Sequence, residues 1–167
     1  MKYHLLTLIF LLLNVAPSEK KTTTIYLITQ AEQDEGKMDP LLSPAGVVRT
    51  RAWGKYFKDK NITTFYTTNM GRSRETATYI ADYIVPKEKR AAFLIRRYEP
   101  WNFNLEHLVQ SHKGESILVI GHTNSIPTHV NALIGTKEYS EIPKWEFDYL
   151  YIIKIKKDQV SHKMVEM

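Results

Sequence analysis

The most informative segment of this 167-residue chain is Thr23-Thr24-Ile25-Tyr26-Leu27-Ile28-Thr29-Gln30-Ala31-Glu32. Its first six residues are β-branched, aromatic or aliphatic, a composition that favours a buried strand. The strand runs directly into a polar loop that begins at Thr29 and Gln30. Ligands of α/β folds bind beyond the carboxyl ends of the strands, so this loop is a candidate site.

Strand and helix patterns alternate along the rest of the chain. Besides the first run at 25–28, strands are expected at 62–67, 91–95, 116–120, 148–155 and 159–165. Helices are expected from Ser43-Pro44 onward, over 77–84, over 104–110 and over 126–133. This alternation predicts one α/β domain, a three-layer αβα sandwich with a mostly parallel central sheet. The closing strand pair either closes or extends that sheet.

The first helix has a clear start signal and a candidate buried face. Ser43 can cap the free amides of the first turn, and Pro44 fits the first helical position. The apolar spacing then predicts a buried face made of Val48, Ala52 and Tyr56, with Trp53 and Phe57 beside them.

The first 18 residues differ from the rest of the chain. Lys2 is followed by an apolar run from Leu5 to Leu13 and by small, turn-forming residues at 14–18. This order predicts a secretory signal peptide over 1–18, a single domain over 19–167 and a secreted or periplasmic location. An uncleaved anchor or a buried strand is the alternative reading. The apolar run is too short for a stable membrane span, which needs about 20 residues.

Composition bounds the classes of ligand. The formal net charge is +5 and the pI about 9.3, so anionic ligands fit the chain, although the basic residues are scattered. No nucleic-acid-binding motif, metal-ligand spacing or glycine-rich nucleotide loop is present, so no nucleic acid, metal or cofactor is expected. The chain has no cysteine and therefore no disulfide.

Three expected strand ends place polar residues at the same edge of the sheet. Gln30 follows the first strand, Arg72 lies where a helix begins after the second, and His122 follows the apolar run 117–120. An arginine beside free helical amides suits phosphate or carboxylate, and a histidine after a central strand suits catalysis or anion binding. Taken singly, Arg72 also fits a surface ion pair and His122 a structural role.

Four segments together resemble the histidine phosphatase superfamily, which includes the phosphoglycerate mutases. They are Thr24 to Glu32, Leu42 to Gly46, Tyr66 to Ala77, and Leu118 to Ser125. The resemblance extends over the whole domain and is greatest for small, exported-looking bacterial members, which also have an element similar to Tyr98-Glu99-Pro100. It implies a phosphoglycerate mutase-like fold and the activity of a phosphoric monoester hydrolase.

The resemblance also implies roles for individual residues. In the family the first strand ends in Arg-His-(Gly or Ala)-Glu, and that histidine attacks phosphorus. By position, Arg72 and His122, with Thr123 beside it, would hold the phosphoryl oxygens, and Glu99 is a candidate proton donor. Thr29 stands in place of the arginine, and Gln30 in place of the nucleophile.

This replacement changes the expected chemistry. The amide nitrogen of Gln30 shares its lone pair with the carbonyl group, so it cannot form a useful phosphoryl-enzyme intermediate. Loss of an arginine removes a charge-assisted hydrogen bond that contributes about 1.5–3 kcal/mol. Thr29 and Gln30 can still donate hydrogen bonds to an oxyanion, so a weakened anion pocket is expected to remain.

The leading hypothesis is therefore a catalytically impaired protein of this fold. It would bind a phosphorylated small molecule, inorganic phosphate or a protein partner. The alternative is an active phosphomonoesterase in which His122 attacks phosphorus and Glu99 or Glu32 donates the proton, with Glu106 as a further acid. A third explanation is that the Thr-Gln pair was introduced or is a sequence error, and that the natural protein is an ordinary phosphomonoesterase.

Two variable segments are expected to shape the ligand pocket. They are 33–40 and 98–103, and the second contains Trp101 and Phe103. Both aromatic side chains could contact a ligand there, and packing against the domain is the favoured role for each.

Overall fold

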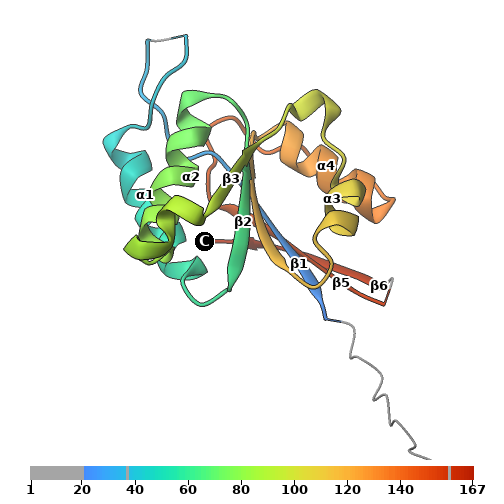
Figure 1. Ribbon diagram of the computed structural model, residues 1–167. Helices are drawn as coiled ribbons and strands as arrows, with labels where there is room; N and C mark the ends of the chain where they lie inside the picture. Colours follow the sequence, from blue (N-terminus) through green and yellow to red (C-terminus); the bar gives the residue numbers. More distant parts are fainter. Residues whose placement is uncertain (1–20, 37, 158) are drawn as a thin grey trace, which may run out of the picture.

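The computed structural model describes residues 21–36, 38–157 and 159–167 (Figure 1). The expected signal peptide, residues 1–18, lies outside the described residues. Among the residues that are described, no helix has both the length and the apolar character needed to cross a membrane.

A six-stranded mixed sheet forms the middle layer. Its strands are β1 (Thr23–Thr29), β2 (Ile62–Thr67), β3 (Leu94–Arg97), β4 (Ser116–Gly121), β5 (Tyr149–Lys156) and β6 (Gln159–Glu166). Their order across the sheet is β3-β2-β4-β1-β5-β6. The first four are parallel, whereas β5 is antiparallel to β1 and β6 to β5. The closing strand pair therefore extends the sheet.

Helices cover both faces of the sheet, as the alternating pattern predicts. Figure 1 shows α1 (Pro44–Phe57) and α2 (Gly71–Ile84) on one side, and α3 (Leu105–Ser111) and α4 (Ser125–Ile134) on the other. Two short 3-10 helices, η1 (Lys87–Ala92) and η2 (Pro100–Asn102), flank β3. The three-layer α/β architecture is confirmed.

The central strand β1 is buried on both faces. Tyr26 and Ile28 belong to the hydrophobic cluster under α1 and α2, while Ile25 and Leu27 belong to the cluster under α3 and α4. Alternate residues of a strand point to opposite faces, so one continuous apolar run fills both cores. This position carries the polar end of β1 to the middle of the sheet edge.

The buried face of α1 differs from the expected one. Ser43 caps the helix, since its Oγ accepts from the Gly46 amide at 3.2 Å. Val48 is 65% exposed, however, and Ala52 is exposed too. The residues that are buried are Gly46, Thr50, Trp53, Gly54 and Phe57.

Close backbone approach explains this rotation of α1. A Cβ at Gly46 would lie 2.1 Å from the Glu32 carbonyl oxygen, and one at Gly54 would lie 2.6 Å from the ring of Tyr83. Two glycines thus let the helix approach the β1 loop and α2, and they set the contact face in place of the apolar stripe.

The third strand is also displaced from its expected range. Residues 87–92 form η1, and β3 begins only at Leu94, where it pairs in parallel with Thr64 of β2. The prediction of a strand over 91–95 was therefore wrong at its start, because pairing with the edge of β2 sets the register rather than local composition.

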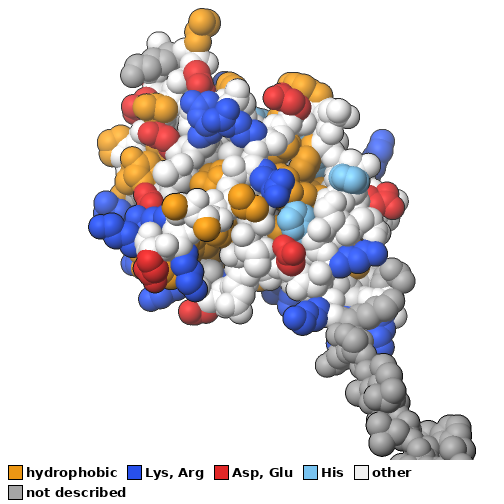
Figure 2. Space-filling model, in the orientation of Figure 1, with side chains coloured by type: hydrophobic (Ala, Val, Ile, Leu, Met, Phe, Trp, Pro, Cys, Tyr) orange, Lys and Arg blue, Asp and Glu red, His pale blue; other side chains and the backbone are white. Residues whose placement is uncertain are grey.

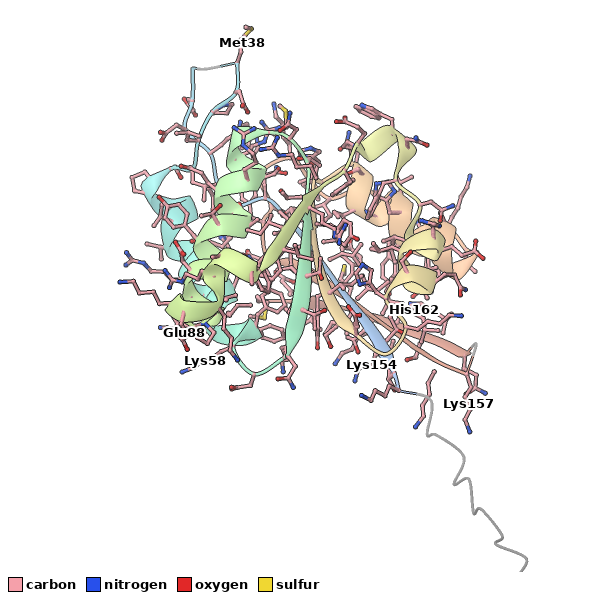
Figure 3. The ribbon with its side chains drawn as sticks, viewed as in Figure 1. Met38, Lys58, Glu88, Lys154, Lys157 and His162 are labelled. Carbon is pink, nitrogen blue, oxygen red and sulfur yellow. The ribbon has the colours of Figure 1, made fainter. Side chains whose placement is uncertain are left out.

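The loop between β1 and α1 projects from the carboxyl end of the sheet. Met38 lies at its tip and is fully exposed, while Lys157 in the β5–β6 turn lies at the opposite end of the molecule (Figure 3). Lys and Arg side chains are spread over the visible face rather than gathered in one patch (Figure 2). The site described next lies at the carboxyl ends of the strands.

Candidate functional site

A cavity of about 540 Å³ opens where β1, β2 and β4 end. It is lined by Gln30 and Gln33; by Thr68, Asn69, Met70 and Arg72; by Glu99, Pro100 and Trp101; by His122, Thr123 and Asn124; and by Glu141, Ile142, Lys144, Trp145 and Phe147. The structure thus brings together the three polar strand ends that the sequence singles out, together with Glu99 and Thr123.

A hydrogen bond joins Gln30 to His122 at the base of the cavity. The two atoms, Gln30 Oε1 and His122 Nδ1, are 2.7 Å apart. Because a carbonyl oxygen can only accept, Nδ1 carries the proton and Nε2 keeps a free lone pair when the ring is neutral. Burial, reinforced by the nearby positive charge of Arg72, lowers the pKa of His122 to about 4. The imidazole is therefore neutral near pH 7.

Backbone pairing holds these two side chains in place. The Gln30 amide donates to the Gly121 carbonyl at 2.9 Å, which continues the parallel pairing of β1 with β4. The His122 amide donates to Ser125 Oγ at 3.2 Å, at the start of α4. Tyr98 supports the end of β4 by donating its hydroxyl to the Ile120 carbonyl at 3.2 Å.

Arg72 lies in the first turn of α2 and lines the cavity. Within the described residues its side chain forms no hydrogen bond or ion pair, and its Nε is buried without a partner. Burial lowers the pKa of Arg72, and the Asp39 carboxylate partly offsets this shift. An unpaired guanidinium beside helical amides is a strong candidate for binding an oxyanion.

Asp39 satisfies the start of α2 without pairing directly with Arg72. Its Oδ1 accepts from the Gly71 amide at 2.6 Å, and its Oδ2 lies 3.8 Å from Arg74 Nη2. Because these two groups hold the carboxylate, the guanidinium of Arg72 stays available to the cavity.

The structure places Thr68 in the cavity and Thr29 outside it, whereas the sequence singled out Thr29. Thr29, expected as a donor to the anion, is only 1% exposed and does not line the cavity. Thr68 does line it, and its Oγ1 is buried with no hydrogen-bond partner in the described part of the chain. The sequence could have identified Thr68, because it is a polar residue directly after β2.

Of the three candidate proton donors, only Glu99 reaches the cavity. Glu32 is held outside it by Arg49, whose Nη2 lies 2.7 Å from Glu32 Oε1, and Arg49 also pairs with Asp148. Glu106 lies on the exposed face of α3 and does not line the cavity. The local sequence could not show which of these acids reaches the cavity, because that depends on ion-pair partners far away in the chain.

The two aromatic residues of the 98–103 segment behave differently. Phe103 packs on Tyr98, with ring centroids 3.9 Å apart, as expected. Trp101 is 87% exposed and lines the cavity, so the expectation that it packs against the domain was wrong. The η2 turn directs it outward. Sequence reasoning also missed the 141–147 loop, which carries a second exposed tryptophan, Trp145.

The described residues contain no cluster of metal-ligating side chains. No group of three or more His, Asp or Glu side chains within the described ranges could hold a metal ion. Arg72, Thr68 and the asparagine amides are instead donors suited to an anion.

Comparison with known proteins shows what this domain is similar to. Residues 28–102, which include Gln30 and Arg72, match the family model described as histidine phosphatase superfamily (branch 1). A search of curated proteins found no significant match.

Three solved structures illustrate the likeness. The protein histidine phosphatase SixA complexed with tungstate has a TM-score of 0.67 at 12% identity, over 86% of this chain and 96% of that one. Bacillus stearothermophilus YhfR has a TM-score of 0.65 at 17% identity, over 83% and 94%. Plasmodium falciparum phosphoglycerate mutase has a TM-score of 0.53 at 16% identity, over 88% and 91%. The fold is thus that of the phosphoglycerate mutase-like histidine phosphatases.

Proposed function

We propose that this protein binds phosphate or a phosphomonoester in the cavity at the strand ends and has lost phosphoryl transfer at the first strand end. The observation that carries the proposal is the hydrogen bond from His122 to Gln30, beside an Arg72 side chain that has no partner among the described residues. It joins the imidazole of His122 to an amide at the position where the family has its nucleophile.

Binding follows from the donors around the cavity. Arg72 supplies a fixed positive charge, and Thr68 supplies a buried hydroxyl without a partner in the described residues. Charge-assisted hydrogen bonds of this kind contribute about 1.5–3 kcal/mol each. The tungstate bound to the SixA structure is a tetrahedral oxyanion, which supports an oxyanion as the ligand here.

Loss of turnover follows from the amide. The Oε1 of Gln30 already accepts from His122, and an amide does not attack phosphorus. Because uncatalysed hydrolysis of phosphomonoesters is among the slowest biological reactions, positioning alone leaves turnover very slow. The protein is thus a divergent histidine phosphatase that retains a ligand pocket.

A second candidate, an active phosphomonoesterase, rests on the tautomer of His122. Its Nε2 carries a free lone pair, and Glu99 lines the same cavity. In this reaction Nε2 would attack phosphorus, the ester P–O bond would break, Glu99 would protonate the leaving oxygen, and water would then hydrolyse the phosphohistidine. No second histidine lines the cavity in the described residues, so less charge stabilisation is available than in the family's usual arrangement.

Calorimetric titration with inorganic phosphate tests the binding proposal. We expect saturable binding that weakens at least tenfold in Arg72→Ala, since one charge-assisted contact is lost. Arg51→Ala, an exposed position on α1 away from the cavity, is the matched control and should bind as the unaltered protein does. Absence of binding, or equal affinity in Arg72→Ala, would contradict the proposal.

A chromogenic aryl phosphate separates the two candidates. The leading proposal predicts negligible turnover by the unaltered protein. Clear turnover that disappears in His122→Ala and falls in Glu99→Gln would instead establish the phosphomonoesterase with His122 as nucleophile.

We also propose that residues 1–18 are a signal peptide and that the domain from 19 onward acts in a secreted or periplasmic location. The charged start and short apolar run support this assignment. Mass spectrometry of the N-terminus after expression in an exporting host tests it. An exported protein that keeps its first 18 residues would contradict cleavage.

A further inference from the structure

Two tryptophans with unusual exposure stand at the rim of the anion cavity. Trp101 is 87% exposed and Trp145 is 65% exposed, and both line the same cavity from different loops. Exposing large aromatic surface to water is unfavourable, so tryptophan in such positions is typical of binding sites. Neither tryptophan is a member of the hydrophobic clusters of the domain.

The tryptophan rings offer faces that attract cations. Lys144 already places its Nζ 5.0 Å from the centroid of the Trp145 ring. The negative face of an indole attracts an ammonium group, and aromatic groups of this kind recognise quaternary ammonium ligands. The contact shows that a cation can lie against Trp145 in this fold.

Two carboxylates share the rim with these rings. Glu99 and Glu141 are exposed and line the cavity, and neither carboxylate has an ion pair or hydrogen bond with another described residue. Against the single Lys144, they leave the rim with an excess of negative charge. Carboxylates that share a cavity rim with indole rings are complementary to a cationic ligand group.

The base of the cavity has the opposite charge. Arg72 is positive and without an ion pair in the described residues, while His122 is neutral near pH 7 because burial lowers its pKa to about 4. The cavity therefore runs from a positive base to a negative, aromatic rim. A ligand that matches both ends carries an anion and a cation on one short molecule.

We propose that the ligand of this site is a phosphomonoester that also carries an ammonium group, with a quaternary ammonium preferred, as in phosphocholine. This inference rests on the proposed function, since Arg72 must hold the phosphate. Trp101 and Trp145 then receive the ammonium group, and Glu99 and Glu141 neutralise its charge.

A flat aromatic ligand is a competing use of the two indoles. Stacking of a ring on tryptophan needs no carboxylate, and it tolerates rings of different kinds. The two rim carboxylates argue for a cation, and they disfavour ligands that carry a second anion near the rim.

Calorimetry with three matched esters tests this choice. Phosphocholine is compared with 3,3-dimethylbutyl phosphate, which has the same shape but carbon in place of the charged nitrogen, and with phenyl phosphate. We expect phosphocholine to bind about tenfold more tightly than its uncharged analogue, as two cation–π contacts would give. Equal affinity of these two esters, or tighter binding of phenyl phosphate, would overturn the inference.

Variants at the rim assign the preference to named residues. Trp101→Leu and Glu141→Gln should each reduce the ratio of the two affinities by about two- to fivefold. Tyr79→Leu and Glu106→Gln, exposed and outside the cavity, should leave the ratio unchanged. An unchanged ratio in both rim variants would show that these side chains do not select the cation.

Titration with inorganic phosphate shows whether a negative result contradicts only the ligand class or the phosphate site itself. If phosphate binds through Arg72 but phosphocholine shows no advantage over its analogue, the ligand class is wrong and the phosphate site stands. If phosphate does not bind and Arg72→Ala has no effect on any ester, the proposed function itself fails.

Discussion

Gln30 Oε1 and His122 Nδ1 lie 2.7 Å apart, although 92 residues separate them in the chain. The contact joins the ends of β1 and β4 across the base of the cavity. It directs the protonated nitrogen of the imidazole toward the amide and leaves the other nitrogen without a proton. The side chain of Gln30 thus sets the tautomer of His122.

Placing the family's arginine and histidine at positions 29 and 30 should give phosphatase activity. We expect Gln30→His to produce measurable hydrolysis of an aryl phosphate, and Thr29→Arg in the same protein to increase it, by at least about a hundredfold over the unaltered protein, because a nucleophile divides the displacement into two easier steps. Acid quenching during turnover should trap a phosphorylated enzyme. A folded double variant without turnover would show that more than these two positions has diverged.

Changing Gln30 to Glu should raise the pKa of His122. A carboxylate accepting from Nδ1 favours the imidazolium, whereas the amide leaves the ring to the effects of burial and Arg72, which lower the pKa to about 4. An NMR titration of the imidazole resonances measures the shift, with the unaltered protein as the reference. A His122 pKa that stays near 4 in Gln30→Glu would show that the two side chains are not in contact in solution.

Stability should fall in mild acid because of His122. Its folded-state pKa of about 4 lies below the ordinary value of 6.5, so the unfolded chain binds more protons between these values. The contribution is fully present above pH 6.5 and is lost as the pH falls to about 4. It amounts to about 2 kcal/mol after its partial exposure is allowed for.

Urea unfolding at pH 4.5, 5.5 and 7.5 measures this loss. His122→Gln should lose less stability with acid than the unaltered protein, since it has no imidazole to protonate at that position. Burial also lowers the pKa of His129, so part of the acid sensitivity should remain in the variant. Identical pH profiles for the two proteins would contradict the assignment to His122.

Asp39→Asn should strengthen phosphate binding. The amide oxygen can still accept from the Gly71 amide, but the negative charge near Arg72 is removed. We expect a gain of about two- to fivefold in phosphate affinity at low salt, shrinking as ionic strength rises. Asp82→Asn, whose ion pair with Arg90 lies near the other end of α2, is the control. A loss of affinity in Asp39→Asn would mean that the carboxylate helps to hold Arg72 in place.

Gly121→Ala should destabilise the fold through Tyr98. A Cβ there would lie 2.5 Å from the Tyr98 hydroxyl and 2.7 Å from Ile126 Cδ1. Overpacking of this kind costs about 1–3 kcal/mol in the free energy of unfolding. Adding Tyr98→Phe removes one clashing atom, so the double variant should be more stable than the sum of the single effects predicts. Strict additivity in denaturant unfolding would contradict a direct clash.

Much of the fold could be predicted from local signals. The apolar runs of β1 and β4, the Ser43-Pro44 start and the final strand pair all agree with the structure because burial and capping act over a few residues. The face of α1 and the start of β3 could not be predicted, because glycine contacts with Glu32 and Tyr83 and pairing with β2 set them.

The residues at the base of the cavity could be predicted from the sequence, whereas the two tryptophans at its rim could not. The strand ends Gln30, Arg72 and His122 meet because carboxyl ends of parallel strands share one edge of the sheet. The outward position of Trp101 depends on the η2 turn, and Trp145 comes from a loop about 45 residues further along. Such contacts leave no periodic signal in the sequence.

The α/β fold and the polar strand ends, with Gln30 among them, could be predicted from the amino-acid sequence, because strand burial and side-chain chemistry are properties of the residues. Which polar groups have hydrogen-bond or ion-pair partners depends on the folded arrangement of distant segments. It directs Asp39 to the Gly71 amide and Glu32 to Arg49, and so leaves Arg72 and Glu99 facing the cavity. The physical reason is that hydrogen bonds and ion pairs between distant segments form only once the sheet has brought the strand ends together.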